Sequence, residues 1–228
     1  MPRTEGMHYA PKGKPHPVVE KNQFSFAVAG LDHGHIYGMC NGLIEAGATL
    51  KYVYDQHTDH LEAFTDVFPE AVPADSLQQI LDDPEINLVA TAAIPSERPD
   101  IGIRVMQAGK DCFTDKAPLI SLEQLKKLKH VTAETGQKYA VYFSERLHSE
   151  AAVYAGQLVK QGAIGEVIHL TGLGPHRLTA SQRPDWFFNK KQYGGILIDI
   201  GSHQIEQFLF FSGSEDASIV NSQIANYH

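Results

Sequence analysis

From residue 24 onward, short apolar runs alternate with amphipathic segments, and this alternation constrains the fold more than any other feature of the sequence. A short apolar run bounded by turn residues is typical of a buried strand, whereas apolar residues at every third or fourth position are typical of a helix. Strands that alternate with helices usually form a parallel sheet covered on both faces. The sequence therefore predicts an α/β protein that begins with a doubly wound parallel sheet.

Residues 24–145 are predicted to form one domain of the Rossmann type. Ser121 and Gln124 predict a capping box at the start of one helix, because each side chain can bind a free amide of the first turn. The expected strands are residues 24–29, 50–54, 88–93, 111–114 and 138–143, and the expected helices are residues 35–46, 58–68, 75–82, 95–109 and 121–136.

The chain on either side of this domain has a different character. Residues 1–23 are polar, contain four prolines and are expected to be a flexible arm. Residues 146–228 predict an incomplete α+β domain with an open, mostly antiparallel sheet. Its expected elements are a helix near 148–161, strands at 166–172 and near 217–226, and a long loop at 174–193.

Composition excludes several classes of protein. A net charge of -8 argues against nucleic-acid binding, which needs a surplus of Lys and Arg on one face. No apolar run is long enough to cross a membrane, and the first residues lack the apolar core of a signal peptide. Cys40 and Cys112 have no metal-type spacing and are expected to be packed thiols in a reducing compartment, which favours the cytoplasm.

The turn after the first predicted strand favours dinucleotide binding. A strand, a glycine turn and a helix present free amides and a helix N-terminus to a pyrophosphate. The usual second and third glycines are replaced by Asp32 and His35, so a structural turn without a ligand stays open as an alternative. The residues expected to contact the cofactor are Gly30, Leu31, Asp32, His33, Gly34, His35, Ala93 and Pro95.

Asp55 at the end of the second predicted strand indicates NAD rather than NADP. A carboxylate there can accept hydrogen bonds from both ribose hydroxyls, and it repels the additional phosphate of NADP. The alternative is that Asp55 only caps the helix that follows it.

The histidines in and after the turn also raise the alternative of a metal site. His33 and His35 lie within the turn, and His57 and His60 follow Asp55. Because the chain has 12 His, such clustering is unsurprising, and we expect no bound metal.

Several longer motifs together identify a resemblance. The chain contains FAVAGLDHGHIYG, AGKDCFTDKAP, FSERLHSEAAVYAGQLVKQGAIGEVIHLTG and GGILIDIGSHQIEQFL, in this order. In these motifs it resembles the Gfo/Idh/MocA family of oxidoreductases, which includes glucose–fructose oxidoreductase and inositol dehydrogenase. The resemblance runs from about residue 24 to residue 228. It implies an NAD(P)-dependent oxidoreductase that transfers hydride to or from a sugar, a polyol or a related hydroxy compound.

The resemblance also implies catalytic residues. The family's E-K-P signature corresponds to residues 115–118, which read DKAP, and makes Lys116 the active-site lysine, in contact with both substrate and cofactor. The family's D-x-G-x-H segment corresponds to Asp199 and His203. His203 is then the expected base, Asp199 its orienting partner or a substrate ligand, and Lys116 the cation that stabilises the alkoxide. Periodicity allows a helix or a strand at 196–203, and only the resemblance favours the helix.

Substrate contacts are expected where polar and aromatic residues gather after the first domain. A loop with converging polar groups and one aromatic ring is typical of a polyol site, although a solvated surface or a subunit contact would look the same. The residues expected to bind substrate, besides Lys116, Asp199 and His203, are Arg146, His176, Arg177 and Trp186.

Two further hypotheses remain beside an active dehydrogenase. One is a regulatory binding module that keeps the nucleotide pocket and lacks the chemistry, which the altered glycine turn favours. The other is a truncated, inactive chain, because family members usually continue through several more strands. That sheet also mediates assembly in the family, so we expect a homo-oligomer, a dimer or a tetramer.

Overall fold

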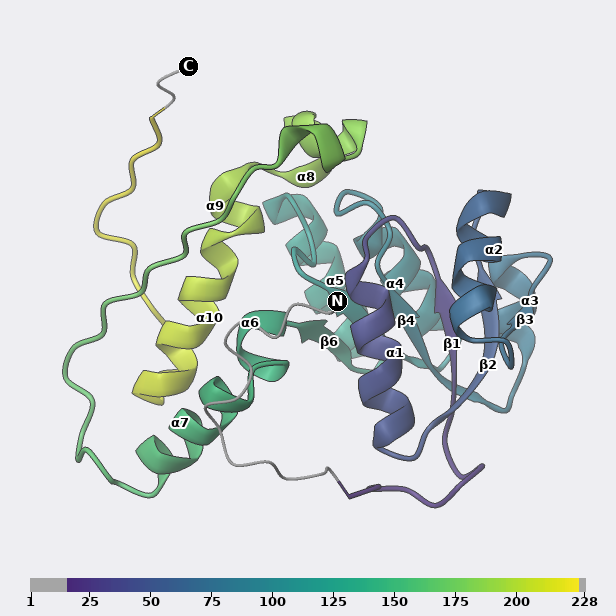
Figure 1. Cartoon of the computed structure of the whole chain (residues 1–228), viewed down its shortest axis with the longest axis horizontal. Coiled ribbons are helices and arrows are strands. Elements are labelled where there is room, and N and C mark those ends of the chain that lie inside the picture. The colour runs from purple at the N-terminus through teal and green to yellow at the C-terminus, as the bar shows by residue number, and fades with distance from the viewer. Residues whose placement is uncertain (1–15, 226–228) are drawn as a thin grey trace.

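The structure, a computed structural model, describes residues 16–225, and its centre is a parallel sheet in the order β3-β2-β1-β4-β5-β6 (Figure 1). Parallel neighbours require long crossover connections, and helices supply them. Successive strands lie on one side of β1 and then on the other, which leaves a crevice between the ends of β1 and β4. The strands are β1 Ser25–Ala29, β2 Thr49–Tyr54, β3 Val72–Pro73, β4 Ile86–Thr91, β5 Asp111–Asp115 and β6 Tyr139–Tyr142.

Helices cover both faces of the sheet, as the alternation of elements predicts. Phe26 and Val28 point to one face, where they are buried with side chains of α1 and α2. Ala27 and Ala29 point to the other face, which α3, α4 and α5 cover. Figure 1 shows α1 in front of the sheet and α4 and α5 behind it. The bounds are α1 His35–Glu45, α2 Thr58–Val67, α3 Leu77–Asp82, α4 Arg98–Gln107 and α5 Leu122–Thr135.

Two local predictions in this domain need correction. Helix α4 begins at Arg98 rather than Pro95, because residues 95–97 form a turn. The capping box of α5 is only half formed. Ser121 Oγ accepts a hydrogen bond from the Gln124 amide at 3.2 Å, but Gln124 Oε1 accepts from the amide of Ile120 rather than from that of Ser121. The short strand β3 was not predicted.

The region after β6 contains helices and extended loops. The predicted strands at 166–172 and 217–226 are wrong over the described residues, which form no strand there. A strand needs a neighbouring strand to bind its amides and carbonyls. The apolar side chains of these segments are also not packed, since Ile168 and Val220 are 91% and 98% exposed. The bounds are α6 Ser144–Leu147, α7 Glu150–Lys160, η1 Ala180–Gln182, η2 Asp185–Phe188, α8 Lys190–Tyr193, α9 Ile196–Asp199 and α10 Gly201–Ser212.

The helices of this region settle one choice that periodicity left open. Residues 196–199 and 201–203 are helical, in α9 and α10, so the helix that the resemblance favoured is confirmed. In Figure 1, α9 and α10 stand to one side of the sheet, and the short helix α6 contacts α10. No helix among the described residues is both long enough and apolar enough to cross a membrane.

Only part of the predicted flexible arm, residues 16–23, lies among the described residues. Residues 1–15 lie outside the described residues. Val18 and Val19 both donate main-chain hydrogen bonds to the carbonyl of Ala46, at the end of α1, at 2.9 and 3.3 Å. The flexibility of residues 16–23 stays a prediction.

Both cysteines are buried, as predicted, and neither forms a disulfide. Burial raises the pKa of the Cys40 thiol to about 12 and also raises that of Cys112. Both thiols stay protonated and act as small apolar side chains of the two cores.

Gly30 shapes the turn that follows β1. Its φ of +89° is one that residues with a Cβ rarely adopt. A Cβ at Gly30 would lie 2.6 Å from Cβ of Ala93, which follows β4, so the absence of a side chain lets the two loops approach. Gly34, four residues later, has a φ of −62° and no atom within 4 Å of a built Cβ.

These two glycines provide a matched test of the turn. Gly30→Ala is expected to lower the free energy of unfolding by about 2–4 kcal/mol, because it adds both a strained φ and an overlap with Ala93. Gly34→Ala is expected to change it by less than about 1 kcal/mol. Urea denaturation of both variants measures this. Equal losses would contradict the close packing at Gly30.

Candidate functional site

Two cavities lie at the carboxyl ends of the strands, one on each side of the turn after β1. The first, of about 460 Å³, we name the acidic cavity, and the second, of about 110 Å³, the histidine pocket. The acidic cavity is lined by Gly30, Asp32, Asp55, Ala93, Glu97, Asp100 and Arg104, among others. The histidine pocket is lined by His33, His35, Pro95, Arg98, Lys116, Glu145, His176, Trp186, Asp199 and His203, among others.

Asp55 fixes the turn from the acidic cavity. It follows β2, is 8% exposed, and accepts the main-chain amide of Leu31 at 2.7 Å and that of His57 at 2.8 Å. Its carboxylate is therefore held at the edge of the cavity and at the same time orients the turn. The hydrogen bond from His57 reaches the residue before α2 and none of the first-turn amides of that helix, so Asp55 does not cap α2 directly.

Negative charge gathers in the acidic cavity. Burial, and then the charge of Asp55, raises the pKa of Asp32. Burial, followed by the charges of Asp32 and Asp55, raises the pKa of Glu97. The carboxylates of this cavity disfavour each other's ionisation, and they would repel an additional anionic group such as a phosphate placed beside them.

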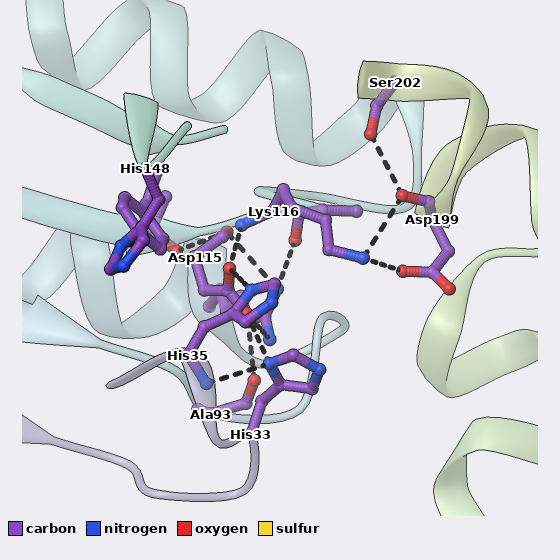
Figure 2. A network of polar contacts seen from close by, with 12 residues as sticks. His33, His35, Ala93, Asp115, Lys116, His148, Asp199 and Ser202 are labelled. Atoms are coloured by element: carbon purple, nitrogen blue, oxygen red, sulfur yellow. Dashed lines mark hydrogen bonds and ion pairs between the residues drawn. The ribbon is translucent and has the colours of Figure 1, made fainter. Parts of the chain in front are cut away.

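Lys116 and Asp199 meet in the histidine pocket from distant parts of the chain. Lys116 follows β5, Asp199 ends α9, and Lys116 Nζ lies 2.6 Å from Asp199 Oδ1. The two residues are 7% and 8% exposed. Figure 2 shows Lys116 extending toward Asp199, whose carbonyl also accepts a hydrogen bond from Ser202 Oγ at 3.2 Å. The close pair keeps an ammonium group in a largely dry site.

His203 is a neutral imidazole beside this pair. It is 2% exposed, and its Nδ1 has no hydrogen-bond partner among residues 16–225. Burial, and then the positive charge of Lys116, lowers the pKa of His203 to about 4. At pH 7 the ring therefore has a free lone pair, which is what a proton acceptor needs.

Asp115, the residue before Lys116, joins the turn to β5. It is fully buried, with Oδ2 3.0 Å from His33 Nδ1 and Oδ1 2.8 Å from His35 Nδ1 (Figure 2). Oδ1 also accepts the Lys116 amide at 2.7 Å, and Arg98 Nη2 lies 3.3 Å from Oδ2. Burial alone would raise the pKa of Asp115, but hydrogen bonds from the two histidines and the charge of Arg98 hold it well below its usual range.

Arg98 is a site residue that the sequence analysis missed. It is 1% exposed, and its Nε donates to the Ala93 carbonyl at 2.6 Å and its Nη1 to that of Ala117 at 2.9 Å. It thereby ties the loop after β4 to the loop after β5. A signal was present, because Arg98 precedes Ile101 and Val105 at helical spacing and so lies on the apolar face of α4.

The predicted substrate residues divide into two groups. His176 and Trp186 line the histidine pocket, and His176 Nε2 lies 3.2 Å from Oε1 of Glu145, a pocket residue that was not predicted. Arg146 does not line it but pairs with Glu206 and lies over the Phe210 ring. Arg177 is exposed and also outside the lining.

The predicted cofactor residues divide in the same way. Gly30, Asp32, Asp55 and Ala93 line the acidic cavity, whereas Pro95 and Lys116 line the histidine pocket together with His33 and His35. Leu31 and Gly34 line neither cavity, and they belong to the site only as part of the main chain of the turn.

The lowered pKa of His203 predicts a pH dependence of stability. Between the folded pKa of about 4 and the ordinary value of about 6.5, the unfolded chain binds more protons than the folded one. Stability must therefore fall as pH decreases through this range. Replacing the imidazole by an amide in His203→Gln removes this contribution, and the variant is expected to lose about 2 kcal/mol less than the wild type between pH 7 and pH 4.5. Urea denaturation across this range measures the difference, and parallel curves would contradict a buried neutral imidazole.

Comparisons with known proteins agree with this architecture. Curated relatives include D-xylose dehydrogenase of Paenarthrobacter nicotinovorans, 26% identical over 132 residues that cover 56% of this chain and 34% of that protein. Another is the scyllo-inositol 2-dehydrogenase (NAD(+)) of Bacillus subtilis, 29% identical over 141 residues that cover 62% of this chain and 40% of that protein. The chain thus spans well under half the length of these relatives.

Solved structures agree as well. A crystal structure of a protein described as an oxidoreductase from Erwinia carotovora atroseptica is 51% identical, with a TM-score of 0.86, and the match covers 90% of this chain and 62% of that one. Levoglucosan dehydrogenase in complex with NADH and levoglucosan shares the fold at a TM-score of 0.72 and 21% identity, over 83% of this chain and 54% of that one.

Family profiles match both parts of the chain. Residues 24–143 match the oxidoreductase family with an NAD-binding Rossmann fold, and residues 153–227 match the GFO/IDH/MocA C-terminal domain. The resemblance found in the sequence is confirmed, and the chain belongs to the GFO/IDH/MocA family of oxidoreductases.

Proposed function

We propose that this chain belongs to an NAD-dependent dehydrogenase that oxidises a CH–OH group of a sugar or polyol. One observation carries the proposal: Lys116, Asp199 and the neutral His203 line one pocket beside the crevice between β1 and β4. In this proposal residues 24–145 bind the nucleotide, and residues 146–228 complete the substrate side of the pocket.

The acidic cavity fits the nucleotide end of the cofactor. It is large and open, it lies at the point where the strand order reverses, and Asp55 stands at its edge, where a ribose would present its hydroxyl groups. Gly30 lets the turn approach Ala93 closely, and Gly34 leaves open space at the start of α1. The carboxylates of Asp32, Asp55 and Glu97 favour NAD over NADP because they repel an additional phosphate. When bound, the nicotinamide supplies a hydride acceptor.

The histidine pocket supplies the acid–base chemistry. His203 can accept the proton of the reacting hydroxyl, because its pKa keeps it neutral at pH 7. The Lys116 ammonium stabilises the negative charge that develops on the oxygen. Asp199 holds that ammonium in place at 2.6 Å. In the reverse direction the same imidazole returns the proton.

The pocket favours an uncharged polyhydroxy substrate. Lys116 is paired with Asp199, and Arg98 is paired with Asp115, so these cations are already neutralised. His176 and Trp186 offer polar and stacking contacts of the kind that bind sugars. The placement of Arg146 and Arg177 outside the lining does not support a role for them in substrate binding.

Assembly and location are further parts of the proposal. Several apolar side chains after α7 are exposed, among them Leu173 at 85%, and such side chains support contact with another copy of the chain. The free, buried thiols Cys40 and Cys112 are compatible with the reducing cytoplasm.

Fluorescence titration and a substrate panel test the proposal. NADH is expected to bind at least about tenfold more tightly than NADPH, because the carboxylates repel the additional phosphate and a tenfold difference in Kd needs only about 1.4 kcal/mol. D-xylose, scyllo-inositol and levoglucosan form the panel, with NAD reduction as the readout. Lys116→Ala and His203→Ala are expected to lower kcat/KM by about 10²-fold or more.

Exposed residues of α5 provide the matched controls. Lys127→Ala and His130→Ala remove the same side-chain types from the surface and are expected to leave kcat/KM unchanged. Full activity in Lys116→Ala and His203→Ala, or binding of NADPH without NADH, would refute the corresponding part of the proposal.

A further inference from the structure

We propose that Arg183 is a substrate-recognition residue, whose guanidinium donates hydrogen bonds to two neighbouring hydroxyl groups of a neutral sugar or polyol in the histidine pocket. The inference rests on the proposed function, because it assigns one side of that pocket to hydroxyl groups that do not react. Arg183 follows η1 and lines the pocket from the part of the chain after β6, so it belongs to a different part of the fold from the turn after β1.

Arg183 differs from the other permanently charged cations of the pocket, which are Arg98 and Lys116. Arg98 is paired with Asp115, and Lys116 is paired with Asp199. Arg183 is half-buried, and no carboxylate pairs with it in the part of the chain that the structure describes. Its guanidinium is therefore the cation that a bound molecule can reach without displacing an ion pair.

Two contacts fix the plane of the Arg183 guanidinium. Its Nε donates to the carbonyl of Leu178 at 3.1 Å, and its central carbon lies 4.5 Å from the centre of the Phe187 ring. Phe187 in turn stacks on Tyr193 of α8, with ring centres 5.2 Å apart. Neither Nη atom has a hydrogen-bond acceptor among residues 16–225. The guanidinium is thus held in one orientation with its outer donors unused, which is the pre-organised fork that arginine offers to a pair of oxygens.

The segment that carries Arg183 is attached to the first domain at two points. The amide of Ser96, in the loop after β4, donates to the carbonyl of Gln192 in α8 at 3.0 Å. A Cβ at Gly194, which ends α8, would lie 2.9 Å from Cγ2 of Ile120, so the end of this helix packs closely against the chain after β5. These contacts hold the segment beside the loops that carry Lys116.

Glu145 gives the same pocket a hydrogen-bond acceptor. Its Oε2 accepts from Gln204 Nε2 at 3.3 Å and from Gln207 Nε2 at 3.0 Å, whereas its Oε1 contacts only His176 Nε2, at 3.2 Å. Each carboxylate oxygen has about two acceptor positions, so Oε1 can accept one more hydrogen bond. A hydroxyl group both donates and accepts, and it therefore suits a pocket with free donors on Arg183 and a free acceptor position on Glu145.

A sugar acid is the main alternative ligand for Arg183. A guanidinium binds the two oxygens of a carboxylate as readily as the oxygens of two adjacent hydroxyls. However, a substrate carboxylate would share the pocket with the carboxylates of Glu145 and Asp199, and like charges at close range in a partly buried site repel each other. Trp186 lines the pocket as well and offers an aromatic face to a sugar ring. The set as a whole favours a neutral polyhydroxy ligand.

Tryptophan fluorescence tests the assignment directly, because Trp186 is the only tryptophan of the chain and lines this pocket. Titration with scyllo-inositol, D-xylose and levoglucosan, without nucleotide, is expected to change its emission for at least one of them. Arg183→Gln and Arg183→Lys are each expected to raise the Kd of that polyol about tenfold or more, because Lys keeps the charge but not the fork. Arg177→Gln is the matched control, an exposed arginine of the same loop outside the pocket lining, and is expected to leave the Kd unchanged.

Kinetics separate substrate recognition from a structural role. For the sugar that the wild type oxidises, both substitutions of Arg183 are expected to raise KM about tenfold with kcat little changed, because the lost contacts are made in the ground state and the transition state alike. The Kd for NADH is expected to stay within about twofold. Urea denaturation shows whether each variant is folded. Arg183→Lys, which keeps an aliphatic stem beside Phe187, provides the test if Arg183→Gln is unstable.

The outcomes distinguish this assignment from the proposed function. Failure of the wild type to bind NADH or to oxidise any sugar refutes the proposed function, and the fluorescence titration still tests Arg183. No response of Trp186 to any of the three polyols, or a wild-type Kd in either Arg183 variant, would overturn the assignment. Tighter binding of D-glucuronate than of every neutral polyol, lost in Arg183→Gln, would overturn it in favour of an anion site. A raised Kd for NADH with unchanged KM would assign Arg183 to the cofactor instead.

Discussion

The arrangement of both cavities depends on the buried carboxylate of Asp115. A carboxylate that is removed from water must receive hydrogen bonds, because an uncompensated buried charge costs several kcal/mol. Asp115 receives them from the turn after β1, from Arg98 of α4 and from the amide of Lys116. One charge thus fixes three segments that are far apart in the sequence, and it determines where the Lys116 side chain begins.

The chemistry of the pocket depends on a second electrostatic balance, between Lys116 and its neighbours. Lys116 and Asp199 form a close ion pair in a largely buried site. Burial, and then the positive charge of Lys116, lowers the pKa of His203, so the imidazole can accept a proton but is a weak base. In the proposed reaction, an alcohol whose oxygen contacts Lys116 would become easier to deprotonate, which would offset the weak basicity of His203.

Much of this molecule could be predicted from the sequence because its signals are local. Apolar runs and helical periodicity indicated five of the strands and the helices on both faces, and Gly30 indicated the tight turn. The motif order placed Lys116, Asp199 and His203 in one site, and the structure brings them together. Residues 166–172 show the limit of local signals. Alternation indicates that a segment can be a strand, but a strand also needs a partner, and the described chain offers none there.

Long-range pairs escaped prediction for a related reason. The contact between His35 and Asp115 joins residues 80 positions apart. In the sequence, Asp115 stands out only because it replaces Glu in the E-K-P signature, and His35 only because it replaces the usual third glycine of the turn. Neither residue signals alone that it has a partner, because hydrogen bonding between side chains leaves no periodic trace in the sequence. Arg98 did leave such a trace, as a charged residue on an apolar helix face, and weighing charge against burial would have identified it.

The division of the turn after β1 between two cavities has a consequence for how its sequence can vary. Main-chain hydrogen bonds from Gly30 to Tyr54 and from His33 to Ala92 hold the turn in register with the neighbouring strands. A substitution within it therefore acts first on the compartment that the changed side chain lines. An insertion or deletion of a single residue would instead shift acidic and imidazole side chains across the divide and change both compartments together. Related chains are thus expected to differ in the composition of this turn far more readily than in its length.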